Sequence, residues 1–189
     1  MSGGTGAMRG RFFLLPLETG HQDGEDWSCL FTLTQVVEVV GRSTKVYPVP
    51  FSPACLPGYI LRWDTVIPVV DVERLCGWVK ASNVRMRQML VIRTGQSAAA
   101  GGEFARLAIV CTGNVSTFTL GEREAGLPVE ALEAPEGFDG HGLARGFFRV
   151  HGRRVVLMDF DALARGLVHI PAGQRMRGGS PPVRGVSAE

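Results

Sequence analysis

Apolar residues along this chain fall mostly in short runs, separated by turn-forming residues about every ten positions. Short runs at this regular spacing are typical of an all-β sandwich or barrel. The clearest candidate strands are Phe12–Leu17, Cys29–Leu33, Val46–Val49, Tyr59–Trp63, Val66–Val70, Met89–Ile92, Leu107–Cys111, Val115–Leu120, Phe147–Val150 and Val155–Phe160. These strands are too many for one small barrel, and they predict two.

Three stretches are instead typical of short helices, each preceded by a residue that can cap a helix and followed by glycine. They are 35–40 after Thr34, 72–76 after Asp71 and 162–165 after Asp161, ending at Gly41, Gly77 and Gly166. Thr and Asp side chains accept a hydrogen bond from the first turn, and Gly often follows the last turn. The first stretch is rich in β-branched valines, whose propensity alone favours a strand.

One spacing of residues occurs twice in the chain. In each copy Gly is followed by Asp at +13 and Leu at +17, and the copies are Gly58, Asp71 and Leu75, and Gly146, Asp159 and Leu163. A two-residue hairpin tip falls midway in both, at Trp63-Asp64 and His151-Gly152. The repeat predicts two barrels of related design, each with a hairpin whose second strand leads into an Asp-capped turn of helix.

The composition is that of an ordinary globular protein, with 45% apolar and 20% charged residues. A net charge of +2 and scattered basic residues argue against nucleic-acid binding. No apolar run approaches the roughly 18 residues that span a bilayer, and 12–17 is too short for a signal peptide. We therefore expect a cytoplasmic protein without membrane insertion. The Gly-rich residues 1–10 predict a flexible N-terminus, and the Gly-, Pro- and Ser-rich residues 171–189 predict a disordered tail.

The sequence carries no common hydrolase or nucleotide-binding motif in the strand–turn–helix context that such motifs need. The four cysteines lack CxxC spacing and the four histidines lack metal-ligand spacing, so we expect no metal and no cofactor. Asp71 and Asp159 could suggest paired carboxylates for acid–base chemistry, but their identical placement before short helices favours capping. Cys111 lies in an apolar run, where a thiol is inert. We therefore predict that the protein is not an enzyme.

The stretch from Cys29 to Gly77 contains a distinctive order of motifs. A strand is followed by Thr-Gln-Val-Val-Glu-Val-Val-Gly at 34–41, by Pro-Phe-Ser-Pro at 50–53 shortly before Gly58, and by Val-Ile-Pro-Val-Val-Asp-Val at 66–72. This order resembles the CheW-like domain family, and a looser resemblance covers 11–167. It implies a mainly β fold of two SH3-like five-stranded barrels with short helices. We expect a CheW-like domain at 11–170, with barrels at approximately 29–88 and 89–160 and the strand 11–17 completing the β-structure.

Two positions depart from the family pattern. Trp63 falls where the family usually carries an Arg that faces the Glu at position 38. Arg62 is expected on the opposite face of its strand, because side chains alternate, and it could reach Glu38 only if the strand were bulged or slipped. Thr112 stands where the family typically has Asp. The chain is thus similar to a divergent member of the family.

The same resemblance implies a receptor groove lined by Val36, Val39, Gly58 and Met89. The two valines could equally be core residues, and Gly58 could serve backbone geometry. The resemblance also makes Glu38, Arg62 and Trp63 candidates for a partner interface. An exposed Trp is a frequent interface hot spot, although it could also cover one end of a barrel.

By resemblance, the protein would be a non-enzymatic chemosensory signalling adaptor. It would couple the cytoplasmic tip of a methyl-accepting chemoreceptor to the regulatory domain of a CheA-type histidine kinase through protein–protein contacts. Membrane-associated chemoreceptor arrays would then be its place of work in the cytoplasm. The alternative keeps the fold and changes the partner: a divergent CheW-like accessory scaffold of a motility, pilus or other signalling system.

Overall fold

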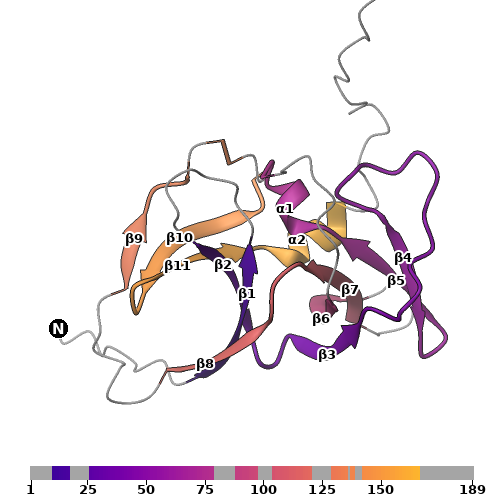
Figure 1. Ribbon diagram of the computed structural model, residues 1–189, viewed down its shortest axis with the longest axis horizontal. Coiled ribbons are helices and arrows are strands. Elements are labelled where there is room, and N and C mark those ends of the chain that lie inside the picture. Colours follow the sequence, from indigo (N-terminus) through magenta and orange to yellow (C-terminus); the bar gives the residue numbers. More distant parts are fainter. Residues whose placement is uncertain are drawn as a thin grey trace, which may run out of the picture.

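The computed structural model describes residues 10–17, 26–78, 88–97, 104–120, 129–135, 137–138 and 142–166. The predicted tail at 171–189 and residues 1–9 of the predicted flexible N-terminus lie outside these ranges. Within them the chain forms eleven strands and two short helices, so the fold is mainly β as predicted. Figure 1 shows how these elements are arranged.

The strands form two sheets, each curled around an apolar interior. The sheet that we call barrel 1 contains β3 (Val36–Gly41), β4 (Gly58–Arg62), β5 (Thr65–Val70), β6 (Gln88–Ser97) and β7 (Phe104–Cys111), in the order β3-β6-β7-β5-β4. The sheet that we call barrel 2 contains β1 (Gly10–Leu17), β2 (Trp27–Thr32), β8 (Ser116–Leu120), β9 (Glu130–Leu132), β10 (Ala144–Val150) and β11 (Arg153–Met158), in the order β8-β1-β2-β11-β10-β9. Helix α1 (Val72–Leu75) follows β5, and α2 (Phe160–Gly166) follows β11.

The sequence predicts that the strands divide between the barrels at about residue 88, and this prediction is wrong. The β6–β7 hairpin lies in the middle of barrel 1, between β3 and β5, and the β1–β2 hairpin lies in the middle of barrel 2, between β8 and β11. Each barrel thus contains a central hairpin from the other half of the chain. Order along the sequence could not reveal this exchange, because strands pair according to register and burial.

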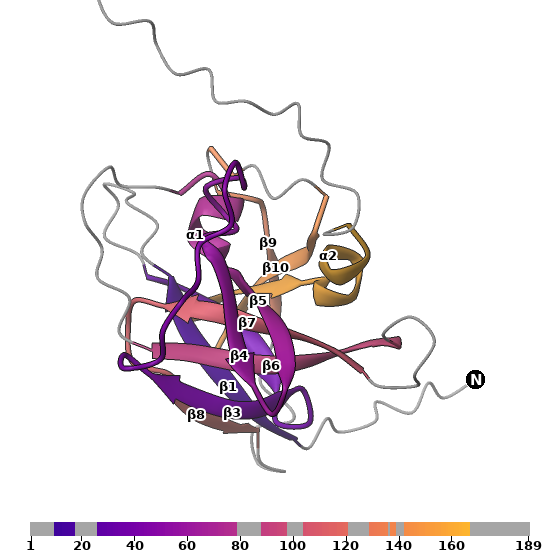
Figure 2. The same cartoon turned by 90° about the vertical axis from the view of Figure 1, so that its right-hand side faces the viewer.

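Two apolar clusters stabilise this arrangement. The larger one draws side chains from both barrels and both helices, among them Phe31, Leu90, Ile109 and Phe160, and therefore joins the barrels to each other. The smaller one fills the interior of barrel 1 with Val40, Ile60, Ile67, Val69, Met89, Val91 and Ala108. Strands β6 and β7 contribute alternate residues to the two clusters, so both of their faces are buried. Figure 2 shows α1 and α2 on the same side of β6 and β7.

The predicted repeat is confirmed as two hairpins with the same register. Gly58 pairs with Val69 in β4–β5, and 88 positions later Gly146 pairs with Leu157 in β10–β11. The two residues at each tip, Trp63-Asp64 and His151-Gly152, all have positive φ, between 46° and 75°. Two successive residues of this kind form the two-residue turn that matches the twist of antiparallel strands. The predicted hairpin tips are therefore confirmed at both places.

The two predicted aspartate caps are confirmed as well. The Asp71 carboxylate accepts a hydrogen bond from the Arg74 backbone N–H at 3.0 Å, and the Asp159 carboxylate accepts one from Ala162 at 2.9 Å. The backbone N–H groups of the same two aspartates donate to Cys55 and Leu143, each three residues before the glycine of its repeat. The repeat therefore extends beyond the residues that revealed it.

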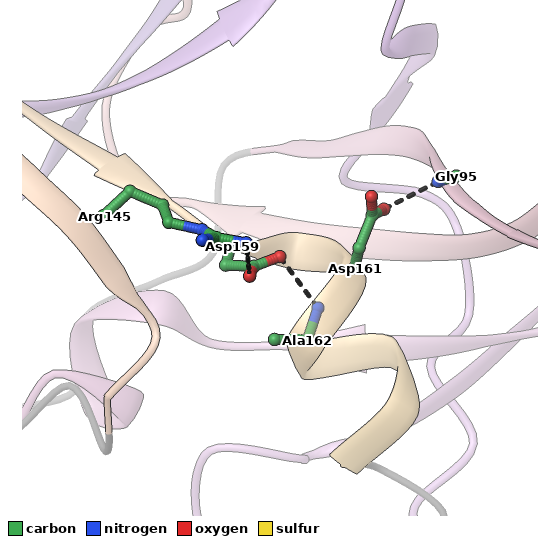
Figure 3. A network of polar contacts seen from close by, with 5 residues as sticks. All are labelled: Gly95, Arg145, Asp159, Asp161 and Ala162. Carbon is green, nitrogen blue, oxygen red and sulfur yellow. Dashed lines mark hydrogen bonds and ion pairs between the residues drawn. The ribbon is translucent and has the colours of Figure 1, made fainter.

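Asp161 does not cap a helix, contrary to the sequence-based prediction. Helix α2 begins one residue earlier, at Phe160, so Asp161 lies inside its first turn. Its carboxylate accepts a hydrogen bond from the Gly95 backbone N–H at 2.6 Å and thereby ties α2 to β6 (Figure 3). The capping residue Asp159 also forms an ion pair with Arg145 in the same network.

The predicted helix at 35–40 is wrong, because Val36–Gly41 is strand β3. Its four valines are β-branched, which restricts their side chains in a helix and suits a pleated strand. Strand β3 pairs with β6 and carries an irregularity in register between Val36 and Glu38. The propensity of the valines thus decides the structure of this segment.

Candidate partner-binding surface

Strands β3 and β4 stand at opposite ends of the strand order of barrel 1, and one ion pair connects them. Arg62 donates from Nε to Glu38 Oε1 and from Nη2 to Glu38 Oε2, both at 2.9 Å. Two parallel bonds of this kind fix the orientation of both side chains. The paired carboxylate also raises the pKa of the Arg62 guanidinium. We call this pair the clasp, since it joins the two edge strands.

The clasp corrects the expectation that Arg62 faces away from Glu38. Trp63 belongs to the turn, so strand alternation ends at Arg62, which shares the interior side of β4 with Ile60. On β3, Glu38 likewise shares a side with the interior residue Val40. The two charged side chains therefore meet across the opening of the barrel without a bulge in β4.

Trp63 lies at the tip of the β4–β5 hairpin, and two cationic side chains lie close to its ring. Its side chain is 52% exposed. The guanidinium carbons of Arg62 and Arg106 lie 5.3 and 5.1 Å from the centre of its ring system. Cations at this distance from an indole face are attracted to it, so the ring keeps a defined position although it faces solvent. Such an ordered, exposed aromatic loses little conformational freedom when it binds another protein.

Two further exposed apolar side chains belong to the same hairpin and lie on the outer side of its strands. Leu61 and Val66 are direct cross-strand neighbours in β4 and β5 and are 52% and 59% exposed. We call the surface formed by Leu61, Trp63 and Val66 the hairpin-1 face. Neighbouring exposed apolar residues, unlike single ones, are a mark of interaction sites.

The second hairpin carries charged residues at the corresponding positions. Arg149 and Arg154 are cross-strand neighbours in β10 and β11, where Leu61 and Val66 stand in the first copy. Arg149 donates to Glu130 of the adjacent strand β9 at 2.6 Å, and the Arg154 guanidinium lies over the Trp27 ring. The apolar outer surface therefore belongs to one copy of the repeat and is not a property of the hairpin design.

The four residues expected in a receptor groove are not brought together. Met89 is fully buried inside barrel 1, so it is a core residue. A Cβ on Gly58 would lie 2.2 Å from the Tyr47 backbone oxygen, which explains the glycine by close backbone approach. Val36 packs against the larger apolar cluster, whereas Val39 is 48% exposed on β3. Among these four residues, Val39 is available for contact with a partner.

Sequence reasoning missed Leu61, Val66 and Arg106 as parts of this surface. Leu61 and Val66 look like ordinary strand residues in the sequence, and the structure shows that both lie exposed on the outer side of the β4–β5 hairpin. A signal existed in the repeat itself, since the counterparts of these two residues are arginines. Arg106 lies in β7, and its approach to Trp63 depends on the parallel pairing of β5 with β7.

Thr112, the second departure from the family pattern, has a role inside the fold. Its hydroxyl donates to Glu73 Oε1 at 2.8 Å, which ties α1 to the end of β7. Thr112 is buried, so this hydrogen bond also satisfies a polar group that water does not reach.

The described residues show no centre for redox or metal chemistry. All four cysteines are free thiols. Burial raises the pKa of Cys76 and of Cys111 to about 12, and it raises that of Cys29 as well. Thiols of this kind stay protonated and unreactive at neutral pH. Within the described ranges no three His, Cys, Asp or Glu side chains are grouped so that they could bind a metal ion.

The helices of the described part are too short to cross a membrane. Comparison with known proteins gives a family model that matches part of the chain and a solved structure with the same fold. Residues 23–104 match the model of the CheW-like domain. A solved structure with the same fold is the scaffolding protein TtCheW from Thermoanaerobacter tengcongensis, with a TM-score of 0.55 and 16% sequence identity over 80% of this chain and 89% of that chain. No curated protein matches the chain.

Proposed function

We propose that this chain, whose residues 23–104 match the model of the CheW-like domain, is a non-enzymatic adaptor of a chemotaxis-type signalling system. Its partners would be the regulatory domain of a CheA-type histidine kinase and the cytoplasmic tip of a methyl-accepting chemoreceptor. It would work in the cytoplasm, at membrane-associated receptor arrays. The proposal assigns it binding surfaces and no chemical step of its own.

The hairpin-1 face is the observation that carries this proposal. It combines an exposed Trp with two exposed aliphatic residues of the same hairpin, and two arginine guanidinium groups lie close to the Trp ring. Interface hot spots are enriched in Trp and Arg and lie where apolar contact excludes water. The equivalent positions of the second hairpin are charged, so we assign the principal partner contact to barrel 1.

The clasp explains how the surface could keep its shape while partners bind. Glu38 and Arg62 join the edge strands beside the hairpin tip, and Arg62 also contacts the Trp63 ring. A surface that is already ordered loses less entropy on association than a mobile one. An adaptor of this kind would influence signalling by favouring the kinase conformation that fits its rigid surface.

Replacing Trp63 tests the proposal. Trp63→Ala should weaken binding of the full chain to a kinase regulatory domain or a receptor-tip fragment by at least about 1 kcal/mol, because the ring is the largest apolar group of the face. Isothermal titration calorimetry measures the affinity, and thermal melting of the free variant measures its stability. The melting temperature should change little, since half of the ring is already in solvent.

Phe51→Ala is the matched control, because Phe51 is also an exposed aromatic residue with positive φ. It should leave the affinity unchanged. A Trp63 variant that melts much lower but binds as tightly as the original chain would make Trp63 a packing residue and contradict the proposal. If neither fragment binds the original chain while a pilus or other motility protein does, the alternative of an accessory scaffold replaces the coupling role.

A further inference from the structure

The interiors of the two barrels correspond residue by residue. The hairpin repeat relates Ile60 and Ile67 of barrel 1 to Phe148 and Val155 of barrel 2, since both pairs are cross-strand neighbours at the same register. The exchanged hairpins extend the correspondence. Val40 faces Met89 across β3–β6 just as Phe118 faces Phe12 across β8–β1.

The two interiors differ in how well they are filled. In barrel 1 the interior side chains are at most 4% exposed and form a closed cluster. In barrel 2 their counterparts surround a cavity of about 150 Å³ that is partly open to solvent. The principal lining groups are the rings of Phe12, Phe118 and Phe148 and the side chains of Leu14, Leu30 and Leu157. The interior of barrel 2 is therefore less well filled, although Phe148 and Phe118 are larger than their barrel 1 counterparts Ile60 and Val40.

Barrel 2 also lacks a counterpart of the clasp. Glu38 of β3 faces Val91, and the same place in barrel 2 is taken by Ser116, which faces Leu14. Arg62 precedes the tip of the first hairpin, and Val150 precedes the tip of the second. Ser116 and Val150 cannot form an ion pair, so β8 and β10 lack the bidentate contact that connects β3 to β4. Strand β10 instead pairs with β9, which is the end strand of barrel 2.

We propose that the barrel 2 cavity is a binding site for a small apolar molecule, about the size of a single aromatic ring. Its volume is close to that of an apolar protein cavity that takes up benzene, and its lining is mainly apolar, with Arg153 among the lining residues. Three phenylalanine rings offer edges and faces to an aromatic ligand. The open side gives such a molecule a way in without unfolding, and this site is separate from the hairpin-1 face.

Benzene is the probe that tests this site on the full chain. Methyl-resolved NMR should show saturable shifts for Leu14, Leu30, Val155 and Leu157, with a dissociation constant in the millimolar range or tighter. The methyl groups of Ile67 and Val69, at corresponding positions in the filled barrel, should not move. Leu157→Phe should abolish the shifts by filling the cavity, while Leu157→Ala should enlarge it and give a larger rise in melting temperature on adding benzene.

Three outcomes would overturn the proposal. One is the absence of saturable shifts at the barrel 2 methyl groups while Leu157→Ala shows no rise in melting temperature. The second is the same shifts at Ile67 and Val69, which would mean unspecific solvation by benzene. The third is displacement of benzene by a receptor or kinase fragment that shifts the same methyl groups, because the occupant would then be a protein side chain.

Discussion

The two hairpins of this protein share a backbone and differ in what they offer to their surroundings. The β4–β5 and β10–β11 hairpins have the same register, the same two-residue tip and the same capped turn of helix. On the outside, the first exposes Leu61 and Val66, where the second has Arg149 and Arg154. On the inside, the first covers a filled interior and the second borders a cavity.

This difference separates the residues that maintain the hairpin structure from the residues that give each copy its own surface and interior. The glycine, the aspartate cap and the turn geometry are common to both copies, so they maintain the hairpin. The outer pair, the tip side chain and the clasp residues differ, so they are free to serve a partner or a ligand. In this protein the first copy has become a candidate protein contact and the second a candidate small-molecule site.

The largest expected effect is a difference in the free energy of unfolding between core substitutions in barrel 1 and in barrel 2. Ile60→Ala should lower the free energy of unfolding by about 2–5 kcal/mol, because it leaves a cavity in a closed cluster. Its counterpart Phe148→Ala should cost less than about 2 kcal/mol although a larger group is removed, since Phe148 already borders empty space. Urea unfolding of both variants measures the difference. Equal losses would show that barrel 2 is as tightly packed as barrel 1.

The hairpin tips give the next effect. Asp64 and Gly152 occupy the same turn position with φ of 57° and 75°. A left-handed backbone costs a non-glycine residue about 1–2 kcal/mol, so Gly152→Ala should destabilise the chain by that amount. Asp64→Gly should be neutral or stabilising. Thermal melting compares the two variants, and a stable Gly152→Ala would mean that the second tip does not need this turn.

Alkaline pH should distinguish the helices that follow the hairpins. Cys76 lies after α1, and the corresponding residue after the second hairpin is Ala164. Burial raises the Cys76 pKa from 9.0 to about 12, so between these values the folded chain keeps a proton that the unfolded chain releases. The Cys76 thiol alone should therefore lower the stability by about 1 kcal/mol over the first pH unit above about 9, and the buried thiols of Cys29 and Cys111 add to this fall. Urea unfolding at several pH values should show a smaller fall for Cys76→Ala, and an unchanged slope would contradict this assignment.

The smallest expected effect comes from transferring the clasp to barrel 2. The double substitution Ser116→Glu with Val150→Arg should connect β8 to β10 as Glu38 and Arg62 connect β3 to β4. Each single substitution serves as the control, because one charge without its partner should not stabilise the barrel. A double-mutant cycle of melting temperatures measures the coupling. A coupling of zero would show that β8 and β10 are too far apart for the comparison to hold.

The sequence predicted what depends on local spacing. Turn residues, aspartate caps and alternating apolar runs act through neighbouring positions, and they revealed the hairpin repeat, its tips and the mainly β fold. It failed where distant residues decide the outcome. Arg62 reaches Glu38 because two edge strands meet, and Met89 is buried because β6 enters barrel 1 from the other half of the chain. The exposure of Leu61 and Val66 likewise depends on what packs against the outer side of the hairpin, which no local pattern specifies.

The exchange of hairpins between the barrels affects the order in which a ribosome-bound chain can fold. The β1–β2 hairpin is synthesised first, but its neighbour β11 is among the last strands to appear. Barrel 1 can close once β7 has emerged. At that point the edge of β2 that pairs with β11 is still unpaired. Barrel 1 should therefore fold before barrel 2 during synthesis. The β1–β2 hairpin would be exposed to chaperones for longest, because its neighbour β11 is synthesised late.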